Sequence, residues 1–177
     1  MIQRKQTLFL FLAVCALVLS FIFPIASFEA KAPLGMPVTG QLKMVAGEEP
    51  ETRSQILNGE PVEIGQSAYV KTWPLAALTI ASAVIALVSI FLYKNRVRQM
   101  RVVAVGFLLG VVDIFLIFIW AVDSFVDQAT QAMACTEVRV TYDVATWAII
   151  VSVVLMFLAQ RFIRSDEEKV RAADRLR

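Results

Sequence analysis

The chain contains no histidine and only two cysteines among its 177 residues. Without histidine it cannot build a His-ligated haem site, the common zinc sites, or a Ser-His or Cys-His catalytic pair. Cys15 lies in an apolar run and Cys135 in a polar loop, so we expect them at different depths and not in a disulfide. The sequence therefore predicts no catalytic residues, no metal site and no bound cofactor.

Charged residues are absent over long stretches, and apolar residues fill those stretches. Hydrophobic residues make up 58% of the chain and the mean hydropathy is +0.68, whereas a soluble domain is about 45–50% apolar. An apolar run of about twenty residues can cross the roughly 30 Å hydrocarbon layer of a bilayer. Four such runs predict an all-α integral membrane protein, an up-down bundle of four transmembrane helices: residues 8–28, 73–93, 102–122 and 144–163.

The first run has a second interpretation as a signal peptide, because Arg4 and Lys5 precede it. The run is long for a signal, and Ala26-Ser27-Phe28 lacks the small final residue of a cleavage site. We therefore favour a retained helix. Pro24 is expected to bend or end its last turn, because proline has no backbone N–H.

The short linker at residues 94–101 carries four positive charges and no negative one. Clustered Lys and Arg are retained on the cytoplasmic side of a membrane, so this linker and both termini are predicted to face the cytoplasm. The predicted inner segments, counted as both termini with the end segment 161–177 and the linker 94–101, then hold twelve basic and four acidic residues, and the outer loops five basic and ten acidic. Residues 164–177 are predicted to form a helical tail. Eight basic residues are candidate contacts to lipid headgroups: Arg4, Lys5, Lys94, Arg96, Arg98, Arg101, Arg161 and Arg164.

Two polar segments, residues 29–72 and 123–143, become the outer loops in this arrangement. Gln41–Ala46 and Val62–Val70 are expected to be extended. Val138–Tyr142 alternates as a strand does and could pair with a strand of the first segment. These features predict a small extracytoplasmic cap that contains short strands.

Two motifs of the first outer loop are short enough to remain ambiguous. Asn58-Gly59 is typical of a hairpin turn, although Pro61 argues against a long strand after it. Glu48-Glu49-Pro50-Glu51 could hold a cation or form a solvated turn. We favour the turn, because calcium loops need several spaced oxygen ligands.

Small residues recur at three- and four-residue steps on the second and third runs, at Ala77, Ala81, Gly106 and Gly110. Small side chains let neighbouring membrane helices approach closely. We predict that these four residues pack helix against helix. Beyond the lipid bilayer, the expected partners are a second copy of the chain or other membrane subunits.

Asp113 is the one acidic residue inside the four runs, and it lies near the middle of its run. An ionised carboxylate at the centre of a membrane helix costs at least about 2.5–3.5 kcal/mol. One interpretation is a site that handles protons or ions. The other, which we favour because no second ionisable group accompanies it, is a packed and protonated carboxyl that holds helix to helix. Five hydroxyl residues are candidate hydrogen-bond partners: Ser20, Thr79, Ser82, Ser89 and Ser152.

Residues 164–177 form a mixed basic and acidic tail. Ile163, Val170, Ala173 and Leu176 fall on one helical stripe. This pattern fits a helix lying on the inner membrane surface and fits a solvated helical tail equally well. Nucleic-acid binding is not supported, because acidic residues are interleaved and no set of stacking aromatic residues is present.

Three stretches carry a resemblance to a known family. They are Met1-Ile2-Gln3-Arg4-x-Gln6-Thr7-Leu8, Leu92-Tyr93-Lys94-Asn95-Arg96-x-x-Gln99-x-Arg101, and Leu158-Ala159-x-Arg161-x-Ile163-Arg164-x-Asp166-Glu167-x-x-Val170-Arg171-x-x-Asp174-Arg175-Leu176-Arg177. They resemble a Bacteroidota membrane family, domain of unknown function 4293. The resemblance implies a bacterial inner-membrane protein with four spans, and it implies no activity. It leaves Asp113 and the outer loops without a counterpart.

Three functions remain open, and we favour a non-enzymatic membrane protein that assembles with itself or with a larger complex. The alternative is a small transporter or channel that uses Asp113, which would require an oligomer because one four-helix bundle has little room for an aqueous path. An intramembrane enzyme is the least supported, since no nucleophile–base pair is recognisable. No small-molecule substrate is indicated.

Overall fold

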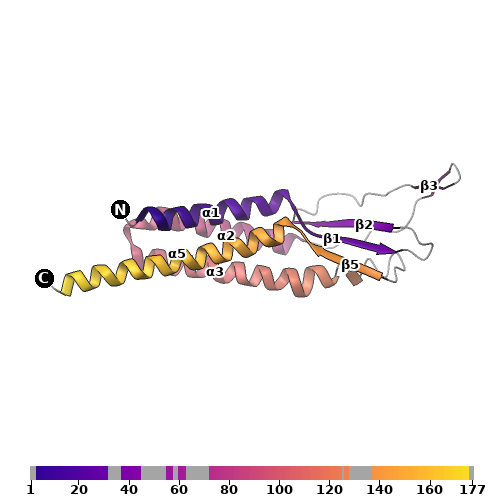
Figure 1. Ribbon diagram of the computed structural model, residues 1–177. Coiled ribbons are helices and arrows are strands. Elements are labelled where there is room, and N and C mark those ends of the chain that lie inside the picture. The colour runs from indigo at the N-terminus through magenta and orange to yellow at the C-terminus, as the bar shows by residue number, and fades with distance from the viewer. Residues whose placement is uncertain are drawn as a thin grey trace.

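In the part of the chain that the structure describes, four long helices lie side by side, and a small β-sheet covers one end of them (Figure 1). The helices are α1 (Gln3–Ile22), α2 (Trp73–Phe91), α3 (Arg96–Leu116) and α5 (Val144–Arg175). This computed structural model describes residues 3–31, 37–44, 55–57, 60–62, 72–124, 126–127 and 137–175. We call the end that carries the sheet the cap end, and the opposite end, where both termini lie, the tail end (Figure 1).

The helices form a ring in which α1 and α3 each pack against both α2 and α5. A short 3-10 turn, η1 (Leu92–Lys94), joins α2 to α3 at the tail end and makes them antiparallel neighbours. Trp73-Pro74 opens α2, where a proline fits because the first turn of a helix needs no backbone N–H bond. At the cap end, α3 continues into a π-helical segment, η2 (Ile117–Ala121).

Buried residues recur along each helix in alternating steps of three and four. This repeat averages 3.5 residues and is typical of helices that interlock as a coiled-coil-like bundle. We call these positions the seam. They are 6, 10, 13, 17 and 20 on α1; 75, 79, 82, 86 and 89 on α2; 99, 103, 106, 110 and 113 on α3; and 145, 149, 152, 156, 159, 163 and 166 on α5.

The seam is polar at many positions, whereas the outer surface of the bundle is apolar. Phe91 is 72% exposed, Trp73 68% and Phe11 56%. Monomeric soluble proteins rarely expose so much contiguous apolar surface. The buried polar residues of the seam are Gln6, Ser20, Thr79, Ser82, Ser89, Gln99, Asp113, Ser152 and Asp166.

Among the described residues, three helices are long and apolar enough to cross a bilayer: Trp73–Phe91, Arg96–Ser124 and Val144–Val170. The apolar part of α1, Gln6–Ile22, is shorter. This set of helices and their exposed apolar surface suggest a membrane protein. The fourth crossing, through α1, stays a prediction.

Two small antiparallel sheets belong to the cap. The larger has the strand order β2-β1-β5, with β1 (Pro24–Lys31) between β2 (Pro37–Lys43) and β5 (Glu137–Tyr142). The smaller pairs β3 (Gln55–Leu57) with β4 (Glu60–Val62). The expected strand at Val138–Tyr142 is confirmed, since it lies within β5.

The expected end of the first span is wrong, because α1 ends at Ile22 and not at Phe28. Pro24 removes a helical hydrogen bond, and the following residues pair as β1 with two strands at once. The partner of β5 therefore begins inside the predicted helix. Of the expected extended pieces, residues 41–43 lie in β2 and Val62 in β4. The rest of these two pieces and both loop motifs lie outside the described residues, namely residues 45–46, 63–70, Asn58-Gly59 and Glu48-Glu49-Pro50-Glu51.

Two further boundaries differ from the expectation. Most of the predicted basic linker is helical, because α3 already begins at Arg96. At the other end of the chain, α5 continues without a break from Val144 to Arg175 and projects beyond the other helices (Figure 1). A single helix that keeps its direction favours the solvated tail over a helix turned onto the membrane surface.

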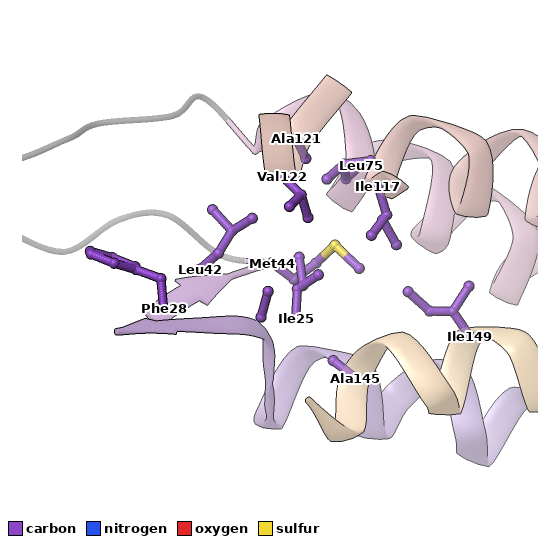
Figure 2. Close-up of a cluster of buried hydrophobic side chains, with 11 residues drawn as sticks. Ile25, Phe28, Leu42, Met44, Leu75, Ile117, Ala121, Val122, Ala145 and Ile149 are labelled. Carbon is purple, nitrogen blue, oxygen red and sulfur yellow. The ribbon is translucent and has the colours of Figure 1, made fainter. Parts of the chain in front are cut away.

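The sheet is fixed to the bundle by a cluster of buried apolar side chains, which we call the junction cluster (Figure 2). A second one, the tail-side cluster, lies further along the bundle towards the tail end. The junction cluster is Ile25, Ala26, Phe28, Leu42, Met44, Leu75, Ile117, Ala121, Val122, Ala145 and Ile149. The tail-side cluster is Leu10, Ala13, Leu17, Ala86, Val103, Met156, Ala159 and Ile163.

Candidate functional site

Asp113 lies on the seam of α3 and is 1% exposed. Its Oδ2 is 2.5 Å from Oγ1 of Thr79 on α2, which is also fully buried. Of the five hydroxyl residues that the sequence offered as partners, Thr79 is the one that contacts the carboxyl. The pair joins the two helices of the α2–α3 hairpin inside the bundle.

The other four hydroxyls bond to backbone carbonyls. Three of them donate within their own helix: Ser20 to Leu17 O, Ser89 to Ala86 O and Ser152 to Ile149 O. Such local bonds are common for serine in helices and satisfy the hydroxyl without a partner helix. Ser82 donates across to Gly106 O of α3 at 3.1 Å.

The hairpin register explains why Thr79 is the partner. Ser89 and Gln99 lie five residues before and after Lys94, and Gln99 Nε2 donates to Ser89 O. Ser82 and Gly106, each twelve residues from Lys94, are also bonded. The same count places Asp113 opposite Leu75, and Thr79, one helical turn further along α2, is the nearest seam hydroxyl. This signal was present in the sequence.

The two oxygens of Asp113 are treated differently by their surroundings. Oδ2 meets Thr79, whereas Oδ1 is buried and has no hydrogen-bond partner among the described residues. A buried polar atom without a partner is rare in proteins and calls for an explanation.

Apolar residues enclose the pair from both ends of the bundle. Along α2, Thr79 falls between Leu75 of the junction cluster and Ala86 of the tail-side cluster. Along α3, Asp113 falls in the same way between Ile117 and Val103. The carboxyl therefore lies inside the bundle between two apolar clusters, away from water, where a hydrogen bond is electrostatically stronger than in water.

The cap reaches this pair through Met44, which follows β2 and is 1% exposed. Met44 Sδ is 3.9 Å from Thr79 Oγ1, and Met44 O accepts a hydrogen bond from Thr72 Oγ1 at 3.1 Å. Two residues at the start of α2 thus hold one residue of the cap. In Figure 2, Met44 lies among Leu75, Ile117 and Ile25.

The two glycines of α3 lie where neighbouring helices come closest. A Cβ on Gly110 would be 2.6 Å from Val153 Cγ2 on α5, and one on Gly106 would be 3.1 Å from Ile85 Cγ2 on α2. The two alanines predicted with them lie off the seam, since Ala77 is exposed and Ala81 half-buried. Close helix approach in the described bundle therefore depends on Gly106 and Gly110.

The described basic candidates gather at the tail end, on the first turns of α3 and the last part of α5. Arg98, Arg101, Arg161 and Arg164 are exposed, and Arg96 is half-buried. Arg164 pairs with Glu168 at 3.2 Å within α5. The side chains of Arg4, Lys5 and Lys94 lie outside the described part of the structure.

A second polar cluster, at the tail end, was not expected from the sequence. The Gln6 amide of α1 donates to Asp166 Oδ2 of α5, and Arg96 of α3 donates to Asp166 O at 3.5 Å. Three helices thus meet at one residue. Both side chains of the first bond occupy seam positions, so the three-and-four repeat was the signal that could have found them.

Within the described residues, no group of three or more cysteine, aspartate or glutamate side chains comes together to hold a metal ion. The comparisons with known proteins give a family and no activity. The family model described as Domain of unknown function (DUF4293) matches residues 2–176. The chain belongs to this family. The searches of curated proteins and of solved structures found no match. Membership of DUF4293 confirms the resemblance of the opening, the linker and the ending.

Proposed function

We propose that this DUF4293 protein is a non-enzymatic structural or assembly component of the bacterial inner membrane that spans the bilayer four times. The observation that carries the proposal is the division of the bundle into a polar, closely packed seam and an apolar outer surface. In the described part of the bundle, every buried side-chain nitrogen or oxygen except Asp113 Oδ1 has a hydrogen-bond partner within the chain. The bundle can therefore serve as a rigid frame between its two ends.

The proposed orientation has both termini in the cytoplasm and the cap in the periplasm. The exposed arginines at the tail end support it, because basic residues favour the cytoplasmic side. For α1, Gln6–Ile22 is about 25 Å long at about 1.5 Å per residue, somewhat less than the hydrocarbon layer. Its outward residues, such as Leu8 and Val18, are as exposed as those of the other helices, which supports a fourth crossing.

The two ends of the molecule are the surfaces proposed to meet other subunits or a second copy. At the cap end, β2 and β5 are the edge strands of the larger sheet. At the tail end, α5 projects beyond the bundle, with Lys169, Val170 and Ala172 exposed. Surfaces on opposite sides of a rigid bundle suit a component that holds partners in place across a membrane.

Gentle extraction of the full chain in lipid nanodiscs, followed by identification of the proteins that co-purify, tests this proposal. We expect a stable assembly larger than one copy, with the same partners after crosslinking in intact cells. The charge reversal Lys169→Glu changes the proposed partner surface of α5 and leaves the seam intact, so it should weaken the assembly without unfolding the protein. A lone species with no crosslinked partner would contradict the proposal.

The unpartnered Oδ1 of Asp113 favours one alternative, a small oligomeric transporter or channel that uses Asp113 as a proton or ion site. The apolar clusters on either side of the residue argue against a continuous aqueous path. Ion flux into proteoliposomes distinguishes the two. The alternative predicts a flux that Asp113→Asn abolishes, whereas a structural role predicts no flux in either protein.

A further inference from the structure

The hydroxyl of Thr79 has more hydrogen-bond acceptors around it than it has protons. Its Oγ1 lies 2.5 Å from Asp113 Oδ2 and 3.0 Å from Leu75 O, the carbonyl one turn earlier on α2. A threonine hydroxyl has a single proton to donate. Leu75 O is a carbonyl and can only accept, so an ionised Asp113 would have to compete with it for that one proton.

Both contacts are satisfied at once if the carboxyl supplies a proton of its own. Asp113 Oδ2 then donates to Thr79 Oγ1, and Thr79 donates to Leu75 O. Oδ1 becomes the carbonyl oxygen of a neutral acid, and leaving a neutral acceptor unpaired is less costly than leaving part of a charge unpaired. This arrangement accounts for the short contact, the second contact and the unpartnered atom together.

We propose that Asp113 and Thr79 form a proton-binding site inside the bundle, whose bound proton links α3 through the Thr79 hydroxyl to Leu75 of α2. The inference goes beyond the proposed function, and either can fail without the other. The ligand is a single proton held on Oδ2. With this proton in place, the Thr79 O–H donates to Leu75 O of its own helix and not to the carboxyl.

The elements around the site hold no other charge at this depth. No ionisable side chain occurs in Gln6–Ile22 of α1 except Cys15, in Trp73–Phe91 of α2, or in Val144–Gln160 of α5. Along α3 and the helical segment that continues it, the next charged residues are Arg101 and Asp123, and on the cap side Lys43 is exposed. No charged side chain of these elements therefore competes for the proton at this depth.

Infrared spectroscopy of the full chain in lipid bilayers at neutral pH tests the site. A protonated carboxyl has a C=O stretching band above the amide I band, and this band shifts in D2O. We expect the band in the wild-type protein, its shift on labelling aspartate with ¹³C, and its loss in Asp113→Asn. Thr79→Val should move the band to higher frequency because the carboxyl O–H on Oδ2 loses its hydrogen-bond acceptor, and Thr79→Ser should leave it in place.

Asp166→Asn is the matched control. Asp166 is also buried, yet it accepts a hydrogen bond from the Gln6 amide and needs no proton to do so. Its replacement should leave the band unchanged. Absence of any ¹³C-sensitive carboxyl band in the wild-type protein would overturn the proposal, and so would a band that disappears in Asp166→Asn. The labelling needs no substitution, so the test holds even if a variant fails to fold.

Discussion

Asp113 and Asp166 are both buried in the bundle, but Asp113 meets a hydroxyl between two apolar clusters and Asp166 meets an amide at the tail end. The hydroxyl can accept or donate, whereas the Gln6 amide nitrogen only donates. Arg96 also approaches the backbone of Asp166. Two buried aspartates therefore make different interactions at the two depths of the bundle. Asp113 joins α3 to α2 between two apolar clusters, and Asp166 ties the first turns of α1 and α3 to α5 near the basic residues.

The largest change in stability is expected in the junction cluster, where Met44 of the cap packs next to the Asp113–Thr79 pair. Met44→Ala should lower the free energy of unfolding by about 2–5 kcal/mol, because it leaves a cavity in the junction cluster. Denaturant unfolding of the full chain in detergent measures the loss. The control is Met100→Ala, at a half-buried position beside the tail-side cluster, which should cost less. If Met100→Ala lowered the free energy of unfolding as much as Met44→Ala or more, Met44 would not be packed in the junction cluster as the structure describes.

Close packing beside Asp113 predicts the next effect. Gly110→Val places a side chain into Val153 and should lower the free energy of unfolding by about 1–3 kcal/mol, because the helices must move apart. Thermal unfolding of the purified protein measures it. Gly106→Ala, where the added atom has more room, is the control and should be milder. If both variants were as stable as the wild type, α3 would not pack as the structure describes.

The third-largest change in stability is expected at Asp113. Asp113→Ala should lower the free energy of unfolding by about 1–2 kcal/mol, because Thr79 loses its cross-helix partner. Asp113→Asn keeps a donor towards Thr79 and should retain most of the stability. Unfolding curves of the two variants, recorded together, make the test. Greater stability of the alanine variant than of the asparagine variant would rule out a hydrogen-bonding role.

At the tail end, Gln6→Ala should lower the free energy of unfolding by about 0.5–1.5 kcal/mol, the usual worth of one hydrogen bond. Water can replace the lost amide here more easily than it can beside Asp113. Hydrogen exchange of the first turns of α1 measures the local effect, which we expect to be confined to the tail end. A loss larger than that of Asp113→Ala would reverse the comparison.

The smallest effect is expected on the projecting part of α5. Arg164→Ala removes an exposed ion pair with Glu168 and should change the free energy of unfolding by about 0.5 kcal/mol or less. Thermal unfolding at low and high salt measures it, and Arg161→Ala is the control. If Arg164→Ala lowered the free energy of unfolding as much as Gln6→Ala, the projecting part of α5 would make contacts beyond the bundle.

Much of the helical frame could be predicted from the sequence, because runs of apolar residues have a simple relation to bilayer thickness. The predicted α2 segment overlaps the observed helix closely, and Val138–Tyr142 was expected as a strand. The end of α1 could not be placed. The residues after Pro24 are apolar enough for a helix, and what makes them a strand is pairing with β2 and β5, which are distant in sequence.

The candidate site was predicted in part. Asp113 stood out as an acid in an apolar run, and the hairpin register could have identified Thr79 as its partner. Met44 could not be found, because nothing in the local sequence shows that a residue after β2 folds back onto α2. For Ala77 and Ala81 the sequence predicted packing positions that the structure does not bear out. Small residues on a helix fit the pattern of close packing, but only burial tells which of them lie on the seam.

The central claim is that the basic tail end faces the cytoplasm and the cap faces the periplasm. A topology reporter fused after Arg177, read against a second reporter inserted between β3 and β4, measures both ends in one cell type. The account predicts a cytoplasmic signal from the first and a periplasmic signal from the second. A periplasmic signal from the fusion at Arg177 would contradict it.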